Sequence, residues 1–461
     1  MTARKQVILA AHFPGVNNTT VWSRPDSGSQ IAFESFVHLA QSAEAAKFDF
    51  FFLAEGLRLR EHRGRIFDLD VVGRPDSLTV LAGLAAVTEH IGLAATCNTT
   101  FNEPYELARQ FATLDHLSGG RAAWNAVTSP DAFTGENFRR GGFLDRDLRY
   151  GRAAEFIEVA QQLWDSWDDD PFAVDAAAGV FLRPGAIHPF EHHGEHFDIR
   201  GRFDVPPSPQ RYPVQIQAGD SDGGRELAAR HAEVIFTHHA AFDDGRVYYE
   251  DVKGRLAKYG RERGDLKILP AATVVLGDTE EDAREAARVI RRQQISPQGA
   301  IAFLEQIWGR DLSELDPDGP LPADDPDPEG TESITRGRVR HSRDPIAIAR
   351  QWRELAESKS LSIRELIMEV TARAAFVGTP RGVAEQLDRH VQEDAADGFI
   401  FVPHLTPHGL DRFFAEVVPE LQDRGVFRAD YEHATLRENL ALPPLRSAQP
   451  VAAGVANQGA S

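Results

Sequence analysis

Short apolar runs alternate with helix-forming segments about eight times along this chain, and this alternation limits the fold more than any other feature. The runs lie at residues 6–13, 50–53, 91–96, 121–127, 213–216, 234–236, 268–276 and 398–402. Between them, apolar residues recur at helical spacing, as they do from Ile31 to Lys47. Strands that alternate with helices predict a parallel sheet covered by helices. Eight such units in 461 residues favour a closed (β/α)8 barrel of the TIM type over an open sheet.

Two stretches interrupt the alternation. Residues 168–210 are rich in Pro, Gly, His and aromatic residues, and we expect little regular structure there beyond a hairpin. Residues 296–344 contain the run PDGPLPADDPDPEG, which is too polar and too rich in proline to pack. We therefore expect one barrel domain over residues 1–442, followed by a loose tail at 443–461. Both insertions are expected at the carboxyl ends of the strands, folded over them as a lid.

Composition excludes several classes of function. The formal net charge of −20 argues against nucleic acid as the main partner, because phosphate backbones require a basic face. No apolar run approaches the ~20 residues of a membrane span, so no membrane association is expected. The first apolar run is short and ends at His12, which favours a first strand over a signal peptide. A single cysteine, Cys97, excludes an internal disulfide framework and favours the cytoplasm.

Polar residues follow several of the predicted strands. They are His12, Glu55, Thr96, Asn98, Asn125, Thr128 and Ser221. In a (β/α)8 barrel the chemistry takes place at the carboxyl ends of the strands, so these side chains predict one shared pocket. The alternative for each Thr, Asn or Ser is a local role in capping the helix that follows.

The stretch from Tyr212 to Phe236 reads as strand, turn, helix and strand, and Ser221 stands where the helix begins. A hydroxyl and free backbone N–H groups at a helix N-terminus form a site for an anion such as a phosphate. The same turn also matches the G-x-S-x-G pattern of a serine hydrolase. The later histidines that such a triad requires are present, at His390, His404 and His408. Both interpretations of Ser221 remain open at this point.

Two further groups of residues suggest ligands. Arg146 and Tyr150 are four residues apart and would share a helix face, where a guanidinium beside a phenol suits a phosphate. The segment 188–196 contains four histidines, but their spacing is not that of a metal site on a helix. We interpret it as a surface hairpin and predict no metal site. No G-x-G-x-x-G or Walker A motif supports a nucleotide site of those types.

Several runs of this sequence resemble the NtaA/SnaA/DszA branch of the bacterial luciferase-like flavin monooxygenases. They include KFDFFFLAEG, RAAWNAVTS, DLRYGRAAEFIEVAQQLWDSW, PVQIQAGDSDGGRELAARHAEVIF and VGTPRGVAEQL. The resemblance implies a TIM-type barrel that binds FMN as FMNH2, supplied by a separate NAD(P)H:FMN oxidoreductase. It also implies an enzyme, a two-component monooxygenase that uses O2 to insert one oxygen into a small organic substrate. Cleavage of a C–S, C–N or C–halogen bond is among the outcomes left open.

The resemblance also implies roles for individual residues. Those expected to bind the cofactor are Glu55, Thr96, Asn125, Thr128, Arg146, Tyr150 and Ser221. Of these, Arg146, Tyr150 and Ser221 would hold the phosphate, and Arg146 stands where the family commonly has His. His12 and Phe13 fall on the substrate side, and His12 is the candidate catalytic residue because an imidazole there could bind substrate or relay a proton. A homodimer or homotetramer is expected. A flavin-binding protein without catalysis remains an alternative.

Overall fold

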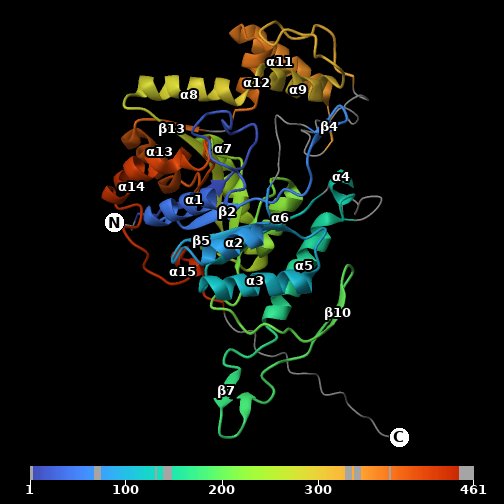
Figure 1. Cartoon of the computed structure of the whole chain (residues 1–461), viewed down its shortest axis with the longest axis vertical. Helices are drawn as coiled ribbons and strands as arrows, with labels where there is room; N and C mark the ends of the chain where they lie inside the picture. The colour runs from blue at the N-terminus through green and yellow to red at the C-terminus, as the bar shows by residue number, and fades with distance from the viewer. Residues whose placement is uncertain are drawn as a thin grey trace.

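Eight parallel strands form a closed barrel at the centre of the molecule (Figure 1). The computed structural model describes residues 4–66, 74–129, 132–138, 148–327, 335–336, 344–372 and 375–445. In barrel order the strands are β1 (Ile8–Phe13), β2 (Phe50–Leu53), β5 (Gly92–Asn98), β6 (Ala122–Val127), β11 (Val214–Gln217), β12 (Val234–Thr237), β13 (Lys267–Leu276) and β16 (Gly398–Phe401). The parallel pairing of β1 with β16 closes the ring. The predicted (β/α)8 barrel is confirmed. Strand β15 (Ala375–Gly378), which pairs with the second half of β13, was not predicted.

Helices surround the barrel, as Figure 1 shows. They are α1 (Phe33–Ala45), α2 (Ser77–Ala85), α3 (Pro104–Ser118), α5 (Arg149–Trp164), α6 (Asp222–His231), α7 (Phe242–Arg255), α8 (Glu280–Gln294), α13 (Pro380–Gln392) and α14 (Asp411–Asp423). Thr279 and Thr379 begin α8 and α13 as N-caps, each hydroxyl accepting from a backbone N–H three residues on. Within the described part of the chain, no helix is both long enough and apolar enough to cross a membrane.

Strand side chains alternate between two hydrophobic cores, because successive residues of a strand point to opposite faces. Inward residues such as Ile8, Ala10 and Phe52 belong to a cluster inside the barrel. Outward residues such as Leu9 and Phe51 pack against the helices in a larger cluster. This alternation decides which polar residues near the strand ends face the barrel interior.

A short helix, α15 (Leu436–Asn439), lies at the amino-terminal end of the barrel. Leu436 packs within the inner cluster, together with Leu440 and Leu442. The approach is close at Gly92, where an added Cβ would lie 2.7 Å from a Leu436 methyl carbon. The leucines therefore fill this end of the barrel. Of the predicted tail, only residues 443–445 lie within the described part of the chain.

The first insertion forms two hairpins, where one was expected. They are β7 (Phe172–Asp175) with β8 (Val180–Leu182), and β9 (Phe190–His193) with β10 (Asp198–Gly201). β7 and β8 lie beyond the end of α5 (Figure 1), and β9 and β10 lie along α5, where Glu155 accepts hydrogen bonds from His192 and from the backbone of Phe197. The expectation that residues 168–210 fold over the strand ends is therefore wrong. A segment between a helix and the next strand leaves from the opposite end of the barrel.

The second insertion packs better than predicted. It contains α9 (Pro297–Trp308), which with α11 (Pro345–Lys359) and α12 (Ile363–Val370) surrounds a hydrophobic cluster of its own. The proline-rich run covers the buried Trp308, whose indole N–H donates to the Asp324 carbonyl at 3.0 Å. For residues 317–327, the described part of this run, the prediction that it is too polar to pack was wrong, because its carbonyls and carboxylates accept hydrogen bonds from Trp308 and Arg353. The segment contacts the loop after β2, where β14 (Thr335–Arg336) pairs with β3 (Glu61–His62) beside β4 (Arg65–Ile66).

Candidate active site

His12 lies inside the barrel near its carboxyl end. Alternation along β1 places it on the same face as Ile8 and Ala10, and it is 6% exposed. Its Nδ1 lies 3.0 Å from the Phe52 carbonyl oxygen. Because a carbonyl only accepts, Nδ1 carries the proton of this hydrogen bond. The imidazole ring is thus held in one orientation.

Two aromatic rings form an apolar layer beside His12. Phe52 of β2 and Phe236 of β12 stack with their centroids 5.5 Å apart and their planes 7° apart. The His12 ring lies 5.2 Å from the ring of Phe52. This layer was not predicted from the sequence, although the inward alternation of Val234 and Phe236 in β12 was a usable signal.

Thr96 and Asn125 face each other across the β5–β6 pairing. The Asn125 side-chain amide donates to Thr96 Oγ1 at 3.0 Å, and both residues are buried. Asn125 Oδ1 is a buried acceptor with no hydrogen-bond partner among the described residues. A buried polar atom without a partner is unfavourable unless a ligand or water satisfies it. This oxygen therefore fits a bound group that presents an N–H inside the barrel.

Glu55, just beyond β2, contacts Asn98 at the end of β5. The Asn98 amide donates to both carboxylate oxygens, at 3.2 and 3.1 Å. Burial raises the pKa of Glu55 to about 7, although the hydrogen bonds from Asn98 act in the opposite direction. Glu55 can therefore exchange a proton close to neutral pH.

Phe13 does not reach the barrel interior. Its ring stacks on Phe36 of α1 at 4.0 Å, and it belongs to the outer cluster between barrel and helices. The assignment of Phe13 to the substrate side is therefore wrong. Adjacent strand residues point to opposite faces, so His12 and Phe13 cannot both face the pocket.

Tyr150 and Ser221 come together, although they are 71 residues apart in the chain. The phenol oxygen of Tyr150 lies 2.7 Å from Ser221 Oγ. Arg149 donates to the same phenol oxygen at 3.1 Å, and its guanidinium carbon lies 4.6 Å from the centroid of the Tyr150 ring. Gly223 permits this contact, because an added Cβ there would lie 3.0 Å from the Tyr150 ring. Arg149, which was not among the predicted site residues, thus brings a positive charge to Ser221.

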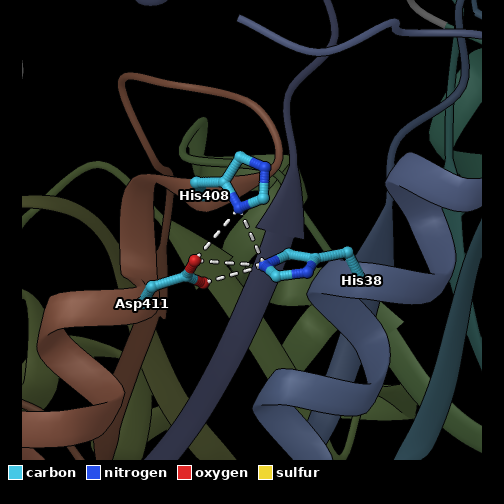
Figure 2. A group of neighbouring side chains, drawn as sticks. All are labelled: His38, His408 and Asp411. Atoms are coloured by element: carbon cyan, nitrogen blue, oxygen red, sulfur yellow. Dashed lines mark hydrogen bonds and ion pairs between the residues drawn. The ribbon is translucent and has the colours of Figure 1, made fainter. Parts of the chain in front are cut away.

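Ser221 is placed as a helix cap and does not form a catalytic triad. It is the N-cap of α6, and its Oγ accepts from the Gly224 N–H at 3.2 Å. Of the histidines that a hydrolase would need, His390 bonds the Gln386 carbonyl, and His408 lies beside His38 and Asp411 (Figure 2). Among the hydrogen bonds of the described residues, none joins Ser221 to an imidazole.

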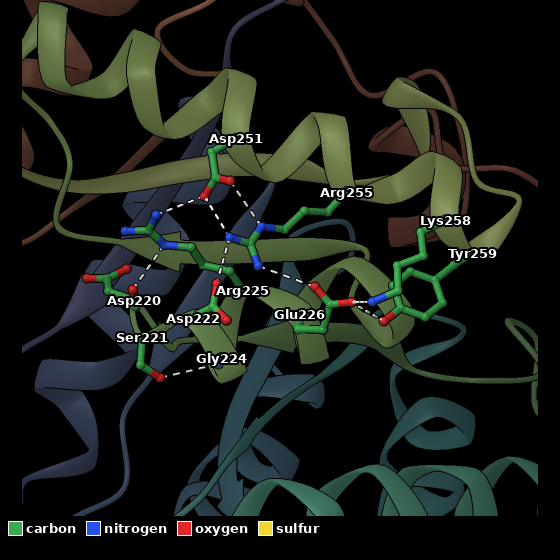
Figure 3. Close-up of polar contacts among 10 residues, drawn as sticks. All are labelled: Asp220, Ser221, Asp222, Gly224, Arg225, Glu226, Asp251, Arg255, Lys258 and Tyr259. Atoms are coloured by element: carbon green, nitrogen blue, oxygen red, sulfur yellow. Dashed lines mark hydrogen bonds and ion pairs between the residues drawn. The ribbon is translucent and has the colours of Figure 1, made fainter.

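An ion-pair network between α6 and α7 holds the helix that Ser221 begins (Figure 3). Arg225 donates to Asp251 at 2.8 Å and to the Asp220 carbonyl at 3.0 Å. Arg255 pairs with Asp222 at 2.8 Å and with Glu226 at 3.3 Å. In Figure 3 the Ser221 side chain points toward Gly224, away from these pairs. Arg225 and Arg255 are therefore engaged with carboxylates, and the exposed charge of Asp222 is offset.

The two remaining predicted cofactor residues are Arg146 and Thr128. Arg146 lies in residues 139–147, outside the described part of the chain. Thr128 is half-buried just after β6, and the backbone N–H of the next residue, Ser129, donates to Thr100 Oγ1 at 3.0 Å.

Three of the four histidines in the segment 188–196 pair with separate carboxylates through their side chains. His188 contacts Asp168 at 2.8 Å, and His192 contacts Glu155 at 3.0 Å. His193 contacts Glu191 and Asp198 through opposite ring nitrogens. This arrangement is that of a surface hairpin with local ion pairs.

Comparisons with known proteins agree with this architecture. Residues 15–398 match the family model described as luciferase-like monooxygenase. The chain is 41% identical to nitrilotriacetate monooxygenase component A of Aminobacter aminovorans, covering 94% of each chain. It is 38% identical to N-acetyl-S-(2-succino)cysteine monooxygenase of Bacillus subtilis, covering 95% of this chain and 97% of that protein. The crystal structure of riboflavin lyase with modified FMN and riboflavin superposes with a TM-score of 0.78 at 28% identity, covering 97% and 98%. The chain therefore belongs to the luciferase-like monooxygenase family and is an oxidoreductase.

Proposed function

We propose that this chain is the oxygenase component of a two-component monooxygenase, which binds FMNH2 and uses O2 to insert one oxygen into a small organic substrate. The observation that carries the proposal is the contact between Tyr150 and Ser221 at the N-terminus of α6. Two hydroxyls, the helix N-terminus and the Arg149 guanidinium converge there on one position. This combination suits a phosphate monoester such as that of FMN.

The residues inside the barrel fit the flavin ring system. The unpartnered Asn125 Oδ1 would accept from a ring N–H, and Thr96 and Thr128 would lie beside the ring. Glu55, with its pKa at about 7, would lie near the polar edge of the ring and hold or release a proton there. Arg146 would complete the phosphate site. When bound, reduced flavin supplies the electrons that activate O2.

The chain's own residues would exclude water and position the substrate. The stacked rings of Phe52 and Phe236 keep the barrel interior apolar below the polar layer, and a dry site protects reactive species from bulk water. His12 would bind the substrate or accept a proton through Nε2, since Nδ1 is committed to the Phe52 carbonyl.

A groove of about 700 Å³ between β3–β4 and α9 offers a route for the substrate. Arg63 and Arg65 line it on one side together with His62 and Glu305, which pair with each other, and Ile301 and Leu315 contribute apolar surface. We infer that the substrate is a small organic anion, because the two guanidinium groups outweigh the one carboxylate of the lining and a net positive rim attracts carboxylates. By their names, two relatives act on compounds with several carboxylates, nitrilotriacetate and N-acetyl-S-(2-succino)cysteine.

A separate NAD(P)H:FMN oxidoreductase would supply the reduced flavin. We further propose a cytoplasmic location and a homodimer or homotetramer. Size-exclusion chromatography with light scattering measures the last of these directly.

Anaerobic titration with FMNH2 tests the cofactor assignment. We expect micromolar or tighter binding, weakened about 10-fold by Ser221→Ala and by Tyr150→Phe, since each removes one hydrogen bond to a charged group. Arg230→Ala is the matched control, because Arg230 lies on the same helix but pairs with Glu158. Unchanged binding in both site variants would refute the assignment.

Turnover tests the activity. The chain, an FMN reductase, NADH and nitrilotriacetate as a first probe are combined under ¹⁸O2, and mass spectrometry follows the label. One labelled oxygen in the product supports the monooxygenase. Arg65→Ala should raise KM for anionic substrates and leave FMNH2 affinity unchanged. Tight FMNH2 binding without oxygen transfer to any probe would instead favour a non-catalytic flavin-binding protein.

A further inference from the structure

Three side chains from segments far apart in the sequence converge between α1 and the start of α14 (Figure 2). His38 lies on α1, His408 on the short 3-10 helix His408–Leu410, and Asp411 is the first residue of α14. His38 Nε2 lies 3.0 Å from Asp411 Oδ1 and 3.1 Å from Oδ2. His408 Nδ1 lies 3.0 Å from His38 Nε2 and 3.1 Å from Asp411 Oδ2. Figure 2 shows the three groups facing one another.

With the Asp411 carboxylate ionised, protons alone cannot satisfy this triangle. The carboxylate then only accepts, so both imidazole nitrogens would have to donate to it. Two N–H groups would then confront each other across the 3.0 Å between His38 Nε2 and His408 Nδ1. If His408 Nδ1 instead accepts from His38, its lone pair faces the Asp411 carboxylate at 3.1 Å. Each arrangement of protons around the ionised carboxylate therefore leaves one contact between two like groups.

A cation among the three atoms removes the conflict, because each then directs a lone pair inward. Nitrogen and carboxylate ligands lie about 2.1 Å from a divalent transition metal. At that distance, ligand atoms 3.0 to 3.1 Å apart subtend about 93° at the metal, close to one face of an octahedron. The observed separations therefore match a metal site with three protein ligands and open positions for water.

We propose that His38, His408 and Asp411 form a binding site for a divalent transition-metal cation such as Zn²⁺, Ni²⁺ or Co²⁺. Two imidazoles and one carboxylate are the ligands that these ions prefer over Mg²⁺ or Ca²⁺. The side chains are 35%, 49% and 42% exposed, so water reaches the remaining positions. The neighbouring Arg412 does not compete for Asp411, because it pairs with Asp278 and Glu416.

The position of the site gives the metal a structural role. α1 follows β1, and the segment with His408 and Asp411 follows β16. β1 and β16 are the pair of strands that closes the barrel. A metal bound by both segments links the first and last units of the fold across this closure. This site was not predicted from the sequence, because His38 and His408 are 370 residues apart and belong to no spacing motif.

Equilibrium dialysis against Zn²⁺ tests the proposal, with metal content measured by mass spectrometry on protein first stripped with EDTA. We expect about one Zn²⁺ per chain in the wild type, and its loss in His408→Ala and in Asp411→Asn. A free Zn²⁺ concentration about 100-fold above Kd should raise the Tm of the wild type by about 3 °C and leave the Tm of the two variants unchanged. The Tm of each variant in EDTA, compared with that of the wild type, shows whether the variant is folded.

His193→Ala is the matched control. His193 is also exposed and has two carboxylate partners, but they contact opposite ring nitrogens and cannot share one metal ion with it. This variant should retain the full metal content. The proposal is overturned if the wild type binds no Zn²⁺, if the His408 and Asp411 variants bind as much as the wild type, or if the metal is lost in His193→Ala.

Discussion

Replacing Glu55 with Gln isolates the free energy of ionising a carboxyl group at the barrel mouth. Burial raises the pKa of Glu55 to about 7 in the folded protein, against an ordinary value of 4.5. Between these values the folded protein binds more protons than the unfolded chain. The contribution of Glu55 to stability is therefore complete below pH 4.5 and is lost as the pH rises through 7.

The two pKa values set the size of the effect. Relative to strongly acidic pH, ionisation of Glu55 lowers the free energy of unfolding by about 2 kcal/mol at pH 6 and about 3 kcal/mol at pH 8. Both are upper limits, because part of the Glu55 side chain reaches solvent. Glutamine has nearly the same shape, can still accept from Asn98 and does not titrate. The stability of Glu55→Gln relative to the wild type should therefore rise by about 1 kcal/mol between pH 6 and pH 8.

Urea unfolding of the flavin-free protein at pH 6, 7 and 8 measures this difference. Comparing the two proteins at each pH cancels every other titrating group, and Glu432→Gln, at an exposed position, is the control for the substitution itself. If the difference between Glu55→Gln and the wild type stays constant across the three pH values, the carboxyl is not buried as the structure indicates. If the stability of Glu55→Gln relative to the wild type falls as the pH rises, the folded protein stabilises Glu55 as the anion.

Three further predictions test other parts of the structure. Gly223→Ala should push the Tyr150 ring aside and weaken FMNH2 binding about 5-fold. By contrast, a Cβ added at Gly254 meets no atom within 4 Å, so Gly254→Ala should leave FMNH2 binding unchanged. Calorimetry should show that Gly254→Ala adds about 0.5–1 kcal/mol to the free energy of unfolding. The hydrogen bond from Lys258 lowers the pKa of Glu226 to about 2, so Glu226→Gln should lose up to about 1 kcal/mol at pH 7 and approach the wild type as the pH falls from 4.5 toward 2. Phe13→Ala should reduce stability by about 3–5 kcal/mol, whereas His12→Gln should lower kcat with little change in Tm.

Most of the barrel was predictable, because each strand is a compact apolar run. The run Phe50–Leu53 could only be a buried strand. In the segments between the strands, apolar residues recurred at helical spacing. The missed strand β15 and helix α9 show the limits of that approach. β15 is four residues long, and the Pro297 that begins α9 looked like a break although proline is favoured in a first helical turn.

The site was predictable where the residue pattern itself implied geometry. Ser221 at a helix start needed only the strand–turn–helix pattern, whereas its contact with Tyr150 was implied by the family resemblance. The error at Phe13 was avoidable, since strand alternation excludes it once His12 faces inward. The position of residues 168–210 also followed from chain order, because the segment joins a helix to the next strand. By contrast, nothing in the sequence placed His38 beside His408.

The positions of Glu55 and Ser221 suggest how the proposed flavin would be held at both ends by one barrel. The proposed phosphate site lies at a helix N-terminus that ion pairs between α6 and α7 hold in place, and it carries fixed positive charge at its edge. The proposed ring site is lined by neutral amides and hydroxyls with one carboxyl whose charge burial suppresses. Positive charge attracts the phosphate, while a neutral interior avoids opposing the negative charge of a reduced flavin. An ionised Glu55 would repel that charge, so FMNH2 affinity should fall as the pH rises above 7, and Glu55→Gln should abolish this dependence.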